Sequence, residues 1–169
     1  MGMLKFGAKL FGTHVVMTLI QFFLFGLLFG IFDNQIYQWI VGIFFIFLYW
    51  VVIYADVSYT GQNDIKRGIY SPARGFLAGL VSIVPDTILY IMSLFYSPLI
   101  FVLQMWQIPY IKILTSLPGL MPHIAYITVL LFPLGAGLCY MDGPRRRKKI
   151  LNAIEKSESM RAEKSKIGR

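Results

Sequence analysis

Residues 74–97 read RGFLAGLVSIVPDTILYIMSLFYS, an apolar run that is long enough to cross a membrane and has one acid near its middle. Small and polar side chains recur along it every three or four residues, close to the period of a helix. These residues are Gly75, Gly79, Ser82, Asp86, Tyr90, Ser93 and Ser97. The pattern predicts a membrane-spanning helix with one small, polar face. A carboxyl group is costly at mid-membrane, so we expect Asp86 to face protein or water rather than lipid.

The composition of the chain is typical of a membrane protein. Of its 169 residues, 57% are hydrophobic and only 14% are charged, and the mean hydropathy is +0.65. The formal net charge of +8 is compatible with nucleic-acid binding, but most of the basic residues lie after Gly143, beyond the last apolar run. Since no nucleic-acid recognition motif accompanies them, they favour contact with membrane lipids, and we expect no nucleic-acid partner.

Four apolar runs predict an all-α integral membrane protein with four transmembrane helices. The expected spans are 13–32, 36–55, 76–97 and 123–141, within a transmembrane domain of residues 1–143. Basic residues concentrate in the N-terminal arm, in the polar connection 56–74 and in the tail 144–169. By the positive-inside rule, both termini of this multi-pass cell-membrane protein are expected in the cytoplasm.

The segment 98–122 is apolar but interrupted. Pro109, Pro118 and Pro122 argue against a regular fifth span, and a fifth crossing would place the basic tail outside. We therefore expect an outer re-entrant or interfacial segment between the third and fourth spans. It either covers the helices and lines a cavity or lies on the membrane surface.

The tail begins directly at the membrane with a basic cluster. Its members are Arg145, Arg146, Arg147, Lys148 and Lys149. Each basic residue near an anionic lipid surface contributes about 1 kcal/mol, so contact with anionic lipids is expected. The tripeptide Asp142-Gly143-Pro144 is expected to end the fourth span and to open a basic cytoplasmic helix. Docking of a cytoplasmic partner is the alternative role of that helix.

Glycines in the spans predict places where helices approach closely. They are Gly26 and Gly30 in the first span, Gly75 and Gly79 in the third, and Gly135 and Gly137 in the fourth. Small residues at such positions let neighbouring backbones approach, although glycine is also common in transmembrane helices for other reasons.

Asp86 has no Lys or Arg within any predicted span to pair with. Gln21 and Tyr49 lie at comparable depth, and Ser82 lies one helical turn earlier. We therefore expect these side chains to hydrogen-bond a neutral or proton-exchanging carboxyl group. His14 is expected near the membrane interface, as a hydrogen-bonding residue and not as a metal ligand.

No catalytic motif is recognisable, so we expect no enzyme, no cofactor and no metal site. The sequence favours an assembly or accessory subunit, in which the polar face of the third span contacts other membrane subunits or a second copy. The alternative is a proton- or cation-coupled transporter or channel component that uses Asp86. A third hypothesis is a membrane enzyme acting on lipid through Asp56, Asn63 and Asp64, which otherwise read as turn-forming residues.

Overall fold

The computed structural model describes residues 2–29 and 34–167, except for the side chains of 118, 121, 122, 159 and 161–167. All the elements in this part of the chain are helices. They are α1 (Met3–Phe29), α2 (Gln35–Lys66), α3 (Ala73–Ser82), α4 (Val84–Phe95), α5 (Pro98–Trp106), η1 (Ile108–Tyr110), α6 (Ile111–Ser116), η2 (Pro118–Leu120) and α7 (Met121–Ile167).

Four segments in the described chain are long and apolar enough to cross a membrane. They are Met3–Phe29, Gln35–Lys66, Ala73–Phe95 and His123–Glu158. The chain is therefore a multi-pass membrane protein, and the expectation of an all-helical chain with four long apolar helices is confirmed.

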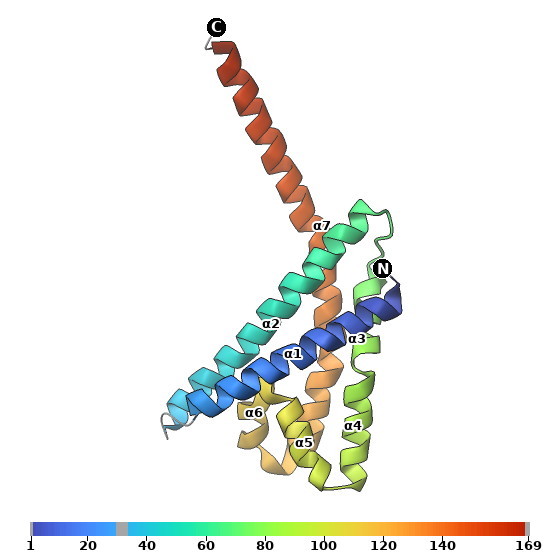
Figure 1. Ribbon diagram of the computed structural model, residues 1–169, viewed down its shortest axis with the longest axis vertical. Coiled ribbons are helices and arrows are strands. Elements are labelled where there is room, and N and C mark those ends of the chain that lie inside the picture. The colour runs from blue at the N-terminus through green and yellow to red at the C-terminus, as the bar shows by residue number, and fades with distance from the viewer. Residues whose placement is uncertain (1, 30–33, 168–169) are drawn as a thin grey trace.

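The helices pack around α7, which makes its most extensive contacts with α2 and α3, while α1 packs on α3. Figure 1 shows the N-terminus, the end of α2 and the start of α3 near one end of the bundle. The C-terminal part of α7 projects from the same end. We call this the tail end. The shorter helices α5 and α6 lie toward the opposite end, beside α4 and the first half of α7 (Figure 1).

Two helices run past the boundaries expected from the sequence. α2 continues to Lys66 instead of ending at residue 55, and α7 continues through the tripeptide at 142–144 instead of ending there. Close packing of α2 against α7 explains both corrections. A Cβ on Gly143 would lie 2.7 Å from the Ser58 carbonyl oxygen, and a Cβ on Gly61 would lie 2.5 Å from the Tyr140 carbonyl oxygen. Gly143, which was expected to help end the fourth span, therefore serves helix contact, and so does Gly61.

The third span and the segment after it are both interrupted. The third span consists of α3 and α4, which meet at Ile83, two residues before Pro85. Proline has no backbone N–H to donate and clashes with the preceding turn, which accounts for the interruption. Between the third and fourth spans, Pro98–Trp106 and Ile108–Ser116 are bent by 84° relative to each other, next to Pro109. This bent segment matches the expected irregular stretch.

Candidate functional site

A small polar cavity lies inside the bundle where the two interrupted segments meet. We call it the central cavity. It is lined by Phe11, His14, Tyr49, Ser82, Asp86, Gln107, Tyr110, Thr128, Val129 and Phe132. The space open to the centre of a water molecule is about 10 Å³, which is close to the least that one water requires.

Asp86 contributes the acid of the central cavity. It lies in the first turn of α4, where the helix dipole favours a negative charge, and only 6% of the residue is exposed. Its carboxylate accepts a hydrogen bond from Trp106 Nε1 at 2.5 Å. Apart from Asp86, the residues lining the cavity are aromatic, aliphatic, amide or hydroxyl residues and one histidine. No Lys or Arg among them neutralises the acid.

His14 lines the same cavity and is also 6% exposed. Its Nδ1 lies 3.0 Å from the Tyr49 hydroxyl, and its ring packs edge-on against Tyr49 and obliquely against Trp106. Its Nε2 is buried without a hydrogen-bond partner in the described part of the chain. Buried polar atoms of this kind are usually satisfied by water, and the central cavity has room for one.

The bent segment is tied to the rest of the bundle by side-chain hydrogen bonds. Trp50 Nε1 donates to the Tyr110 hydroxyl at 2.9 Å, and Thr18 Oγ1 donates to the Trp106 carbonyl at 3.3 Å. α1 and α2 therefore hold this segment in place beside Asp86. We infer that the segment forms part of the site and does not lie apart from the helices.

The structure brings together three of the four residues of the expected intramembrane polar site. Asp86, Ser82 and Tyr49 line the central cavity, but Gln21 does not. Gln21 instead donates from Nε2 to the Phe45 carbonyl at 2.9 Å. Ser82 Oγ donates to the Gly79 carbonyl of its own helix at 2.8 Å.

Sequence reasoning missed several residues of the site and did not assign His14 to it. It missed Gln107, Tyr110 and Thr128 in the cavity lining, and Trp106, which bonds Asp86. His14 was expected near the interface because the first span was expected to begin at residue 13. Since α1 already begins at Met3, His14 lies well inside the helix and inside the bundle. Polar and aromatic residues within the apolar segment 98–122 were the available signal for Trp106, Gln107 and Tyr110, and Thr128 is a polar residue of the fourth span.

The small face of α3 packs against α7 of the same chain. A Cβ on Gly75 would lie 2.4 Å from Tyr140 Cβ, and a Cβ on Gly79 would lie 2.6 Å from Pro133 Cα. In α7, a Cβ on Gly135 would lie 2.2 Å from the Trp50 ring, whereas one on Gly137 would make ordinary contact with Phe76 at 3.4 Å. These glycines serve close packing within the chain.

Gly26 differs from those glycines. A Cβ added there would meet no described atom within 4 Å, and Gly30 lies outside the described residues. Gly26 therefore has no packing role between the described helices, and the expected pairing with Gly30 lies outside the described residues.

A second polar cluster lies at the tail end. Asp64, 2% exposed, accepts a hydrogen bond from the Tyr140 hydroxyl at 2.9 Å, and its carboxylate lies 3.3 Å from Arg74 Nε. Tyr70 stacks on Tyr140 with ring centroids 5.3 Å apart. This cluster joins α2, α3 and α7 where the third span begins.

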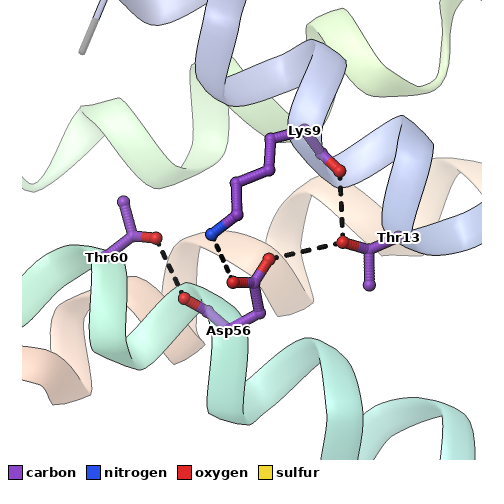
Figure 2. Close-up of polar contacts among 4 residues, drawn as sticks. All are labelled: Lys9, Thr13, Asp56 and Thr60. Carbon is purple, nitrogen blue, oxygen red and sulfur yellow. Dashed lines mark hydrogen bonds and ion pairs between the residues drawn. The ribbon is translucent and has the colours of Figure 1, made fainter.

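Asp56 makes separate contacts with α1. Figure 2 shows Lys9 Nζ and the Thr13 hydroxyl bonded to the Asp56 carboxylate, and Thr60 bonded to the Asp56 carbonyl. Asp56 and Asp64 thus have different partners on different helices. In the described residues no group of three or more His, Cys, Asp or Glu is placed to hold a metal ion.

The basic cluster at the start of the tail is largely exposed. Arg145, Arg146, Lys148 and Lys149 are exposed, and Arg147 is partly covered. Arg146 also has protein contacts, because its guanidinium lies 4.4 Å from the centre of the Tyr54 ring and 3.5 Å from Asp142. Tyr54 in turn donates to Asp142 at 2.5 Å.

Comparisons with protein-family models, with curated protein sequences and with solved structures give no match for this chain. Its function is therefore inferred from its own residues and their geometry.

Proposed function

We propose that this chain is a small proton-coupled transporter or channel component in which Asp86 takes up and releases a proton inside the membrane. The observation that carries the proposal is the burial of Asp86 in a water-sized cavity of a single chain, without a basic partner in its lining. Intramembrane acids that face polar cavities commonly mark proton and ion paths. Interrupted helices that meet at a polar site near mid-membrane are also typical of transporters.

His14 is the proposed second member of the proton path. With Nδ1 donating to the Tyr49 hydroxyl, Nε2 is a free acceptor beside the central cavity. A water in the cavity would carry the proton between the Asp86 carboxyl and this nitrogen. Trp106, which donates to Asp86, stabilises the carboxylate that remains after the proton leaves.

The proposed orientation places the tail end in the cytoplasm. Lys9, Arg74 and the basic cluster of the tail all belong to this end, in agreement with the positive-inside rule. Both termini are then cytoplasmic, and the segment 98–122 re-enters the membrane from outside. The basic cluster at 145–149 is proposed to contact anionic lipid headgroups.

An assembly or accessory subunit is the second candidate function. The sequence suggested that the small face of the third span would contact other subunits. Gly75 and Gly79 on that face instead pack against α7 of the same chain, so the face is not free for such a contact. A different observation favours an accessory role: α7 projects from the tail end, and its side chains at 148–158 are exposed. This projecting helix is suited to dock a cytoplasmic partner. The exposed surface at Gly26 is suited to contact a second copy or other membrane subunits.

The third candidate, a lipid-modifying enzyme, receives no support from the acids on which it would depend. Asp56 is paired with Lys9 on α1, and Asp64 faces Arg74 and Tyr140. They do not converge on one site.

The test is proton uptake by the full chain in proteoliposomes that contain a trapped pH-sensitive dye, driven by an imposed membrane potential. Asp86→Asn is expected to abolish uptake, because the amide keeps the shape of the side chain but cannot exchange a proton. Asp56→Asn is the matched control: it makes the same substitution outside the central cavity and should retain uptake. Equal uptake by the wild type and Asp86→Asn refutes the proposal.

Native mass measurement separates the two leading candidates. In the accessory role, the full chain is isolated with a partner or a second copy, and Asp86→Asn leaves both that assembly and the transport background unchanged, because Asp86 is buried inside the single chain. In the transport role, assembly is the same in wild type and Asp86→Asn while proton uptake is lost.

A further inference from the structure

A groove open to the bilayer lies between α1 and α5. It is lined by Val15, Thr18, Leu19, Phe22, Val102, Met105 and Trp106, and encloses about 270 Å³. Leu19 is 55% exposed and Val102 is 44% exposed, so the groove faces lipid. We call it the lateral groove. Its walls are almost entirely apolar and carry no charged side chain.

Trp106 links the lateral groove to Asp86. Its side chain lines the groove, while its indole N–H bonds the Asp86 carboxylate. Trp106 is the last residue of α5, immediately before the bend. Its ring packs against His14 and Phe11, with centroids 5.3 Å and 5.9 Å away. Rotation of this one side chain would break its bond to Asp86 and free the carboxylate for another partner.

We propose that the lateral groove is the binding site of a lipophilic organic cation, which enters from the bilayer and whose charge pairs with Asp86 when Trp106 turns away from that carboxylate. This inference rests on the proposed function, because the cation and the transported proton use the same carboxylate. Charge complementarity argues for a cation. The titratable groups that share the central cavity with Asp86 are His14 from α1, Tyr49 from α2 and Tyr110 from η1, and none is a Lys or Arg.

Aromatic side chains on the path from the groove to Asp86 fit the same ligand class. Phe22 and Trp106 line the groove, and Phe11 packs against Trp106. Faces of aromatic rings attract organic cations, and such groups recur where proteins bind quaternary ammonium compounds. The apolar groove provides the surface on which hydrophobic substituents pack. A phospholipid acyl chain would also fit the groove, but it would have no use for Asp86.

The exchange is balanced in charge. The neutral carboxylic acid of Asp86 releases one proton, and the resulting carboxylate binds one monovalent cation, with no covalent bond of the ligand made or broken. Repeated from the two sides of the membrane, this competition exchanges a proton for the cation.

The test uses tetraphenylphosphonium and the purified full chain in detergent, in a weakly buffered solution. Tryptophan fluorescence reports binding, and an indicator dye reports released protons. We expect saturable binding with about one proton released per cation, and at least about tenfold weaker binding without proton release in Asp86→Asn. Trp106→Phe is expected to accelerate binding, because the N–H bond that closes the path is absent.

A substitution on the lipid-facing surface tests the groove without disturbing the core. Leu19→Trp fills the lateral groove and is expected to weaken binding about tenfold. Leu27→Trp is the matched control, because it makes the same change on an exposed position of α1 outside the groove and should leave the affinity unchanged.

Two results overturn the inference: unchanged affinity in Leu19→Trp, or unchanged affinity in Asp86→Asn. Either means that the probe only partitions into the micelle or that the groove holds an acyl chain. Proton uptake measured without any organic cation tests the proposed function separately. If Asp86→Asn loses that uptake while Leu19→Trp binds normally, only the cation site is refuted.

Discussion

The contact of α3 with α7 at Gly79 provides a sharp test of the fold. A Cβ on Gly79 would lie 2.6 Å from Pro133 Cα and 3.2 Å from Pro133 Cβ, well short of the 3.4 Å at which ordinary contact begins. The nearest atom belongs to the backbone of α7, so no side-chain rotation relieves the clash. We expect Gly79→Ala to force the two helices apart next to the central cavity.

The expected loss of stability follows from two opposing effects. Overpacking of a close contact costs about 1–3 kcal/mol, whereas replacing glycine by alanine within a helix returns about 0.5–1 kcal/mol. The net decrease in the free energy of unfolding then lies between about 0 and 2.5 kcal/mol, with a middle value of about 1.3 kcal/mol. Reversible unfolding in mixed micelles, followed by circular dichroism, measures it.

Gly26→Ala is the matched control for this experiment. It makes the same substitution in a helix at a site where a Cβ meets nothing within 4 Å. We expect unchanged stability or a gain of up to about 1 kcal/mol. A Gly79→Ala variant as stable as Gly26→Ala would show that α3 and α7 do not approach as described.

The remaining predictions concern the tail end. Tyr140→Phe should lower the free energy of unfolding by about 1.5–3 kcal/mol, because the buried Asp64 carboxylate loses a hydrogen bond; an unchanged unfolding curve would contradict this. Lys9→Met should lower it by less than about 1 kcal/mol, since the ion pair with Asp56 is partly exposed, and a larger effect would contradict that estimate. A peptide of the tail, residues 144–169, should bind vesicles of anionic lipid. Replacing its basic residues 145–149 by glutamine should weaken the free energy of binding by about 1 kcal/mol per residue. Vesicles of zwitterionic lipid are the control, and equal binding of both peptides to anionic vesicles would refute the lipid contact.

The sequence predicted those features that depend on local pattern. The recurrence of small and polar residues along 74–97 indicated a helix with one packed face, and Gly75 and Gly79 on that face do contact α7. The cost of a carboxyl group in lipid indicated that Asp86 faces protein, and it is buried.

Features that depend on contacts between distant segments could not be predicted in this way. Gly61 and Gly143 favour helix ends when considered locally, but close packing of α2 on α7 keeps both inside long helices. The bond between Trp106 and Asp86 forms only because the segment after the third span bends back beside it. No single-sequence pattern specifies the direction of that bend.

The continuity of α7 beyond the bundle has a mechanical consequence. The backbone from Met141 to Ile167 stays in the helix that also carries Thr128 and Pro133, so the projecting part forms a lever arm about 40 Å long. A tilt of the membrane part by about 10° would move its far end by about 7 Å. Small rearrangements at the centre of the bundle would thus be amplified into displacements large enough to follow with a spectroscopic label on the tail.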